Sequence, residues 1–162
     1  MKLDRDWIAA HIPHHGSMCL LDEVLSWDLQ RICCRSTSHR APDNPLRSHG
    51  RLGAACAIEY AAQAVAVHGA LMKNPTLKSP TATGSGFGML TSARRVEFAV
   101  ARLDDLPNEL LVSAQRLHSD AVSALYSFAL QDGERLLAQG RLSLLHGAPA
   151  PANLAGDPVA PA

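Results

Sequence analysis

Between Gly53 and Met72 the chain is apolar at almost every position and reads GAACAIEYAAQAVAVHGALM. The segment has no proline, and its strongly polar residues are Glu59, Gln63 and His68. A helix that is apolar nearly all the way round must be buried on most sides. Its length of ~30 Å could also cross a bilayer, but a glutamate in mid-helix costs roughly 2–3 kcal/mol or more in lipid. The segment therefore predicts a core helix that ends before Asn74-Pro75.

Downstream of this helix the apolar positions change to the two-residue repeat that is typical of strands. The clearest case is Val122–Leu130, which is followed by the hairpin dipeptide Asp132-Gly133 and a return strand over Arg135–Leu145. Similar segments precede it at Arg94–Val100 and Glu109–Leu117. Together they predict four antiparallel strands after the helix.

Two apolar segments precede the helix, at Met18–Leu25 and Arg31–Ser38, with a turn near Asp28 between them. The predicted order is thus two strands, one long helix and four strands. A helix that is apolar around its whole girth needs a sheet curved around it, so the fold class is α+β.

The rest of the pattern sets the domain limits. With 162 residues the chain has the size of one domain, which we place at residues 1–146. From residue 147 the sequence GAPAPANLAGDPVAPA has four prolines and no periodicity, which predicts a disordered tail over 147–162. The stretch Asn74–Gly88 is rich in Pro, Thr, Ser and Gly, and we expect a mobile loop there.

Charge and cysteine content exclude several classes of protein. Fifteen basic residues balance fifteen acidic ones, so nucleic acid is a poor partner, and the buried helix gives no reason to expect a membrane. The four cysteines show no C-x-x-C spacing, which favours a reducing compartment. The opening MKLDRDWIAAH is too charged for a signal peptide, and we expect a cytoplasmic protein.

Glu59 is the first candidate for chemistry. Burial of a lone carboxylate disfavours its charge and raises its pKa, as a general acid at neutral pH requires. The alternative is a glutamate paired with an arginine at a subunit interface. Gln63 lies one turn further on the same face, where it could orient the carboxylate, touch a substrate or satisfy a buried backbone group. His68 lies well round the helix, and we interpret it as structural.

Several motifs resemble the β-hydroxyacyl-ACP dehydratases of the FabA/FabZ type. Residues Ile12–Val24 read IPHHGSMCLLDEV, similar to that family's L-P-H-R-x-P-x-L-L-V-D-R-V, and Glu59–Ala64 read EYAAQA, similar to its E-A-x-A-Q-A. The similarity continues through Gly88–Leu90, a glycine-led entry to a strand, and through Arg94–Phe98. It spans about residues 10 to 145.

The chain resembles still more closely the ApeP-like dehydratases of aryl-polyene-type pathways. Asn44–Arg47 (NPLR), then Gly50–Leu52, then a glycine ahead of IEYAAQ are typical of them. The resemblance implies a hotdog fold, in which a curved antiparallel sheet of about five or six strands wraps one long central helix. It also implies a homodimer or a heterodimer of hotdog subunits, and an acyl substrate carried through phosphopantetheine on acyl carrier protein. No cofactor is expected.

Within this resemblance Glu59 is the catalytic acid and a histidine is the base. The family's histidine belongs to a G-H-F-P loop, over which Ser48-His49 can be laid. His49 lies only ten residues before Glu59 and is followed by Gly50-Arg51, so the loop is shortened. We take His49 as the candidate catalytic base and His39 as its alternative.

The remaining candidates would surround the substrate. We expect Gln63, Gly53, Gly88, Met89, Leu90 and His14 to bind it, with Met89 and Leu90 lining an acyl tunnel. Glycine at position 53 would let backbone amides at the helix start approach a thioester oxygen. Arg51, Arg94 and Arg95 could contact phosphopantetheine or an acidic carrier surface, or serve solubility alone.

Three histidines near the N-terminus have a spacing that could suggest a metal site. On a helix, His11, His14 and His15 would lie on one face. Pro13 breaks such a helix, and no nearby cysteine or acid completes a ligand set, so no metal is predicted. In the resembling family this region packs near the tunnel without metal.

The leading function is dehydration of a (3R)-3-hydroxyacyl chain on acyl carrier protein to a trans-2-enoyl thioester, in fatty-acid or polyene-type biosynthesis. An acyl-ACP or acyl-CoA thioesterase is the first alternative, because the same fold hosts that activity. A non-catalytic hotdog subunit that partners an active dehydratase is the second.

Overall fold

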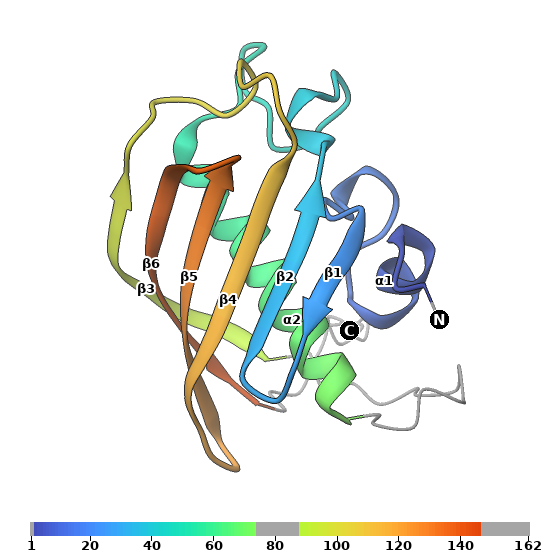
Figure 1. Ribbon diagram of the computed structural model, residues 1–162, viewed down its shortest axis with the longest axis vertical. Helices are drawn as coiled ribbons and strands as arrows, with labels where there is room; N and C mark the ends of the chain where they lie inside the picture. The colour runs from blue at the N-terminus through green and yellow to red at the C-terminus, as the bar shows by residue number, and fades with distance from the viewer. Residues whose placement is uncertain (1, 74–87, 147–162) are drawn as a thin grey trace, which may run out of the picture.

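A long helix, α2 (Ala57–Lys73), lies across one face of a curved six-stranded antiparallel sheet (Figure 1). The computed structural model describes residues 2–73 and 88–146. A short 3-10 turn, η3 (Ala54–Cys56), runs directly into α2. The predicted tail at 147–162 and nearly all of the loop predicted over 74–88 lie outside the described residues.

The sheet has the strand order β1-β2-β4-β5-β6-β3, so β1 and β3 form its two edges. Its strands are β1 (Glu23–Trp27), β2 (Arg31–Ser36), β3 (Met89–Phe98), β4 (Leu110–Ser119), β5 (Ser123–Asp132) and β6 (Arg135–Leu145). The order of elements along the chain, two strands, a helix and four strands, is the predicted one. The α+β class is thereby confirmed.

The helix α2 is the core of the molecule, as its apolar girth predicted. Tyr60, Ala61, Ala64, Val67 and Leu71 are all fully buried. By length and composition the helical segment at residues 54–73 would be apolar enough to span a membrane. Here it packs instead against β2, β4 and β5, whose inward side chains alternate with half-buried ones.

The hairpin between β5 and β6 forms one residue later than predicted. Asp132 still belongs to β5 and pairs with Arg135, so the two-residue loop consists of Gly133 and Glu134. Gly133 has φ 59°, a conformation that glycine adopts without a steric penalty.

Two strand boundaries differ from the prediction for physical reasons. The first strand begins at Glu23 rather than Met18, because Leu20 bonds to side chains instead of a neighbouring strand. The third strand begins five residues earlier than Arg94, at Met89. Its side chains are mostly exposed on both faces, so alternation gave no signal there.

The sequence pattern also missed a helix at the N-terminus, α1 (Arg5–His11). Its N-cap is Asp4, whose side chain accepts a hydrogen bond from the Trp7 amide. The helix buries only Ile8, so it has no apolar stripe that periodicity would detect. It ends at His11 with Ile12 as the C-cap, before Pro13, and leaves His14 and His15 outside the helix.

His68 is structural, as expected. Its ring is fully buried, with Nε2 2.8 Å from the Asp28 carbonyl and Nδ1 3.0 Å from the Tyr126 hydroxyl. A carbonyl only accepts, so Nε2 carries the proton and Nδ1 accepts from Tyr126. This ring links α2 to the β1–β2 turn and to β5. Burial lowers the pKa of His68 below its ordinary value.

The lowered pKa of His68 predicts a stability that falls in mild acid. Below about pH 6.5 the unfolded chain takes up a proton that the folded chain resists, so the free energy of unfolding decreases with falling pH. One such group contributes at most about 1.4 kcal/mol per pH unit. His68→Gln replaces the ring by an uncharged group that can still donate and accept, and denaturant titrations between pH 7 and 5 should show a shallower slope. The exposed control His15→Gln should keep the wild-type slope, and an equally steep His68→Gln would contradict the account.

Candidate active site

The carboxylate of Glu59, in the first turn of α2, is held by two side chains at one of its oxygens. His14 Nε2 lies 3.1 Å from Glu59 Oε1, and Gln63 Nε2 donates to the same oxygen at 3.0 Å. The Glu59 side chain is 31% exposed and that of His14 is 27% exposed. Oε2 has no hydrogen bond among the described residues, so this oxygen can receive a ligand or a proton.

Gln63 fixes this arrangement from the interior. Its Nε2 also donates to the Met18 carbonyl at 2.8 Å, and its Oε1 accepts from the Leu20 amide at 2.9 Å. The side chain is fully buried. Two of the roles left open for Gln63 therefore hold together, because it satisfies buried backbone groups and orients the carboxylate.

The pKa of Glu59 moves in the direction opposite to the predicted one. Burial raises it and is the largest single effect, but hydrogen bonds to His14 and Gln63, and the charge of His14, together lower it below its ordinary value. The sequence showed the apolar helix but not the donors that meet the carboxylate from the preceding segment. The expectation of a raised pKa was wrong.

His14 was predicted to bind substrate and proves to be the histidine in contact with Glu59. It follows Pro13, which ends the α1 region and places the imidazole over the start of α2. Its Nδ1 is buried without a hydrogen bond to any described residue. The Nε2–H tautomer fits this site, because a buried Nδ1–H without an acceptor would be costly.

His49, the predicted base, lies at the tip of an exposed turn. His49 and Gly50 both have positive φ, 50° and 74°, and the turn is closed by hydrogen bonds between Ser48 and Arg51 in both directions. Its Nδ1 is 3.0 Å from Ser48 Oγ. Within one subunit no ion pair or hydrogen bond joins His49 to Glu59 among the described residues, and its role as base stays a prediction.

His39, the alternative base, is fully buried instead of lying in a solvent-facing loop. Its Nε2 is 3.3 Å from the Leu106 carbonyl. Burial lowers the pKa of His39. A substrate would reach this ring only after local opening of the fold, which removes His39 from the candidate site.

The other predicted substrate contacts are spread over two regions. Gly53 precedes η3 and is exposed, with open space where a Cβ would stand. Gly88 precedes β3, and a Cβ there would lie 3.1 Å from the Leu145 carbonyl oxygen, so glycine permits a close approach. Met89 and Leu90 open β3 and are 51% and 37% exposed. An acyl tunnel at these residues would need a second surface to cover them.

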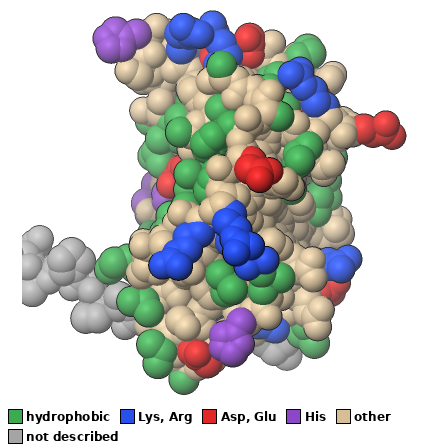
Figure 2. Space-filling model, turned by 90° about the vertical axis from the view of Figure 1, so that its left-hand side faces the viewer, with side chains coloured by type: hydrophobic (Ala, Val, Ile, Leu, Met, Phe, Trp, Pro, Cys, Tyr) green, Lys and Arg blue, Asp and Glu red, His purple; other side chains and the backbone are tan. Residues whose placement is uncertain are grey.

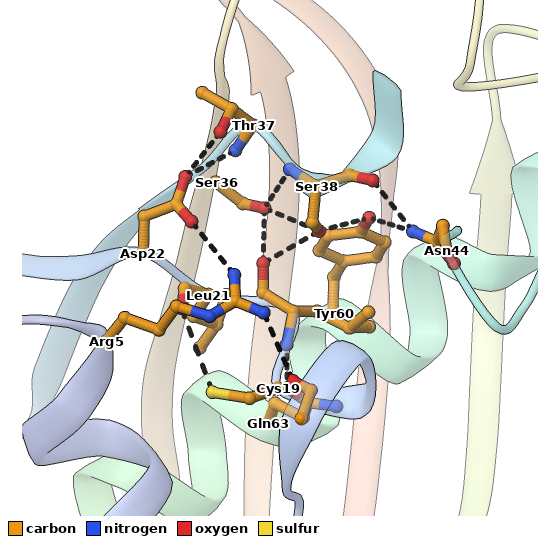
Figure 3. Close-up of polar contacts among 12 residues, drawn as sticks. Arg5, Cys19, Leu21, Asp22, Ser36, Thr37, Ser38, Asn44, Tyr60 and Gln63 are labelled. Atoms are coloured by element: carbon orange, nitrogen blue, oxygen red, sulfur yellow. Dashed lines mark hydrogen bonds and ion pairs between the residues drawn. The ribbon is translucent and has the colours of Figure 1, made fainter. Parts of the chain in front are cut away.

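A buried polar network beside Gln63 was not predicted. Tyr60, one residue after Glu59, is fully buried, and its hydroxyl lies 2.8 Å from Ser38 Oγ and accepts from Asn44 Nδ2 at 3.2 Å (Figure 3). Ser36 and Ser38 both donate to the Leu20 carbonyl. The network joins the NPLR segment to α2 and to the backbone that Gln63 holds. The only sequence signal for it was a tyrosine on an apolar helix, since a buried hydroxyl needs partners.

This network underlies a surface pocket of about 430 Å³. Its walls come from α1, the β1 entry, η2 (Ser38–Arg40) and the segment after it. The lining residues are Arg5, Ser17, Asp22, Thr37, Ser38, Arg40, Ala41, Asp43 and Asn44. Asp22 is already engaged there, by Arg5 and by the amide and hydroxyl of Thr37.

In the described part of the chain no group of three or more His, Cys, Asp or Glu residues could hold a metal ion. The four cysteines are free thiols.

The sheet wrapped around one helix, with a carboxylate in the first turn of that helix, defines a protein of the hotdog class. A model of the ApeP-like family, described as ApeP dehydratase, matches residues 7–154. The chain belongs to the ApeP-like dehydratase family. No protein with curated function matches it.

Solved structures share the fold. The dehydratase heterocomplex ApeI:P from Xenorhabdus doucetiae matches with a TM-score of 0.74 and 23% identity, covering 87% of this chain and 91% of that one. Zebra fish thioesterase superfamily member 2 matches with a TM-score of 0.58 and 16% identity, over 88% and 95%. A hypothetical thioesterase from Streptococcus pneumoniae, solved with coenzyme A, matches with a TM-score of 0.52 and 10% identity, over 78% and 85%. At these identities the likeness concerns the fold.

Removing the side chain that organises the site should cost stability as well as geometry. Gln63→Leu removes the partner of the buried Leu20 amide and of the part-buried Met18 carbonyl, and an unsatisfied buried group costs roughly 1–3 kcal/mol. We expect the free energy of unfolding to fall by about 2–4 kcal/mol in chemical denaturation, because the Met18 carbonyl can regain a partner in water. Gln30→Leu, at an exposed glutamine, is the matched control and should change it little. A neutral Gln63→Leu would show that the Gln63 contacts do not hold the segment.

Proposed function

We propose that this protein removes water from a (3R)-3-hydroxyacyl thioester carried on acyl carrier protein and yields the trans-2-enoyl thioester. The observation that carries the proposal is the Glu59 carboxylate, fixed at Oε1 by His14 and Gln63 and open at Oε2. Membership of the ApeP-like dehydratase family supports the reaction class.

In this proposal Glu59 acts first as a base. The lowered pKa of Glu59 keeps the carboxylate ionised at neutral pH, so Oε2 can take the proton from C2 of the acyl chain. The C2–H electron pair forms the C2=C3 bond, and the C3–O bond breaks. The hydroxyl leaves with a proton returned from the active-site pair, so that one water is released and the carboxylate is restored. His14 acts as a positioning residue that holds Oε1 throughout.

A second hotdog subunit, identical or different, is part of the proposal. Among the described strands β3 pairs only with β6, and the ApeI:P dehydratase with the same fold is a heterocomplex. A subunit packed along β3 would cover Met89 and Leu90 and create a tunnel wall for an acyl chain. It would also give the exposed His49 a route to the active site of the other subunit.

The proposal is tested with Glu59→Gln and a synthetic (3R)-3-hydroxyacyl pantetheine thioester. The amide cannot accept the C2 proton, so we expect at least about a 10³-fold loss of enoyl product with an unchanged unfolding temperature. Glu134→Gln, in the exposed β5–β6 loop, is the matched control and should keep full activity.

The same incubation separates the competing functions. Thioesterases with this fold make hydrolysis the second candidate, and it would release free pantetheine thiol from a saturated acyl thioester instead of forming an enoyl product. A wild-type chain that forms neither product alone, but forms enoyl product once a second hotdog subunit is added, would be a partner subunit. Dehydration undiminished in Glu59→Gln would end the proposal.

The two histidines make different predictions. His14→Gln retains an N–H donor toward Glu59 Oε1, whereas His14→Leu removes it, so kcat should fall in the order wild type, Gln, Leu with KM little changed. The acidic limb of the kcat–pH profile should move to higher pH in His14→Leu, because Glu59 loses a hydrogen bond that lowers its pKa.

His49→Gln should reduce kcat only if the Ser48–Arg51 turn reaches the active site of the paired subunit. Full activity in His49→Gln would remove that residue from the mechanism.

A further inference from the structure

The edge strand β3 combines an open hydrogen-bonding edge with exposed apolar side chains. It runs for ten residues and pairs with β6 on one side only among the described strands. Met89, Leu90 and Phe98 are 51%, 37% and 43% exposed on it. Figure 2, which faces this side of the molecule, shows hydrophobic side chains around a pair of basic ones. A long edge of this kind pairs readily with another chain unless something opposes it.

Three arginines at this edge form no ion pair with any described residue. Arg94 lies directly across from Arg141 of β6, Arg95 follows Arg94, and all three are exposed. Within the described residues none of them has an ion pair or a hydrogen bond to a carboxylate. The nearby acid Glu97 is itself bound by Gln139 at 2.8 Å. Like charges directly opposite one another destabilise a strand pair.

An irregularity in the backbone of β3 at Arg94 and Arg95 carries conformational strain. Arg94 pairs with Arg141 and Glu97 with Gln139, so β3 carries one extra residue there, and Arg95 has φ 51°. A residue other than glycine in this region costs roughly 1–3 kcal/mol, and such strain concentrates at functional positions. Both Arg94 and Arg95 therefore reach solvent at the middle of the strand.

Pairing of two identical copies along β3 would bring these charges together. A two-fold antiparallel interface joins the same surface of both copies, so the middle of one β3 faces the middle of the other. With both strands fully paired, Arg94 would stand beside Ala93 of the second copy, and the arginines of both copies would crowd around the axis. The apolar side chains favour association there, while the charges oppose association with self.

Resting on the hotdog pairing in the proposed function, we propose that Arg94, Arg95 and Arg141 select the partner of β3. They reject a second copy of this chain and accept a hotdog subunit of different sequence whose facing strand carries carboxylates. A mismatched charge that repels the wrong partner and pairs with the right one is a common device of specific interfaces.

The test uses a charge-reversed copy of the chain as the acidic partner. Wild type, the Arg94→Glu/Arg95→Glu variant, and their equimolar mixture are compared by native mass spectrometry and sedimentation velocity at low salt. We expect the mixed dimer to be at least about tenfold tighter than either self-dimer, with the advantage lost as salt rises. Arg31→Glu/Arg40→Glu, with the same charge change at exposed arginines of β2 and η2, should form no such mixed dimer. Circular dichroism checks that each variant is folded.

Three outcomes would overturn the inference. The first is a wild-type homodimer that is tight at low salt and insensitive to the Arg94→Glu/Arg95→Glu change. The second is a mixture as monomeric as its components. The third is unchanged association together with loss of turnover on carrier-borne substrate alone, which would assign the arginines to the carrier protein. Association is measured without substrate, so failure of the dehydratase assay leaves this result independent.

Discussion

The site depends on one buried amide side chain. The Gln63 amide nitrogen donates to the Glu59 carboxylate and to the Met18 carbonyl, and its amide oxygen accepts from the Leu20 amide. This backbone follows the segment that carries His14, so the contacts that hold the entry to β1 also support the contact between His14 and Glu59. In a molecule whose core is mostly alanine and leucine, this polar centre sets the position of the segment ahead of β1 against α2.

Much of the fold could be predicted from the sequence, because its strands bury one face and its central helix is buried on most sides. The apolar girth of α2 and the alternation in β5 and β6 report a helix inside a sheet, and these elements lie where the pattern placed them. The apolar pattern missed α1 because this helix buries a single residue. It also missed the start of β3 because neither face of that strand is covered, although the family resemblance placed a strand entry at Gly88–Leu90. Pattern analysis reports burial within the chain and has no signal for a strand whose side chains stay exposed on both faces.

The candidate site was less predictable than the fold. Glu59 and Gln63 share a helix face, so their neighbourhood followed from spacing alone. The contact between His14 and Glu59 joins segments 45 residues apart and depends on how Pro13 directs the chain, which spacing does not report. The direction of the Glu59 pKa followed from that contact, and the expected burial effect was outweighed by donors that local sequence does not show.

Gly140 of β6 gives the edge of the sheet an unusual dependence on its neighbour. A Cβ at this position would lie 3.0 Å from side-chain atoms of both Phe128 and Val96, so a side chain on β6 here would require these neighbours, one of them on β3, to shift. A change from Gly140 to alanine would push β3 outward at Val96. The segment of β3 that carries Arg94 and Arg95 would then shift, although neither arginine had changed. A substitution at the half-buried Gly140 can thus change the position of exposed residues on β3. Relatives of this chain could acquire new partners in this way, and a comparison of their exposed residues alone would not reveal the cause.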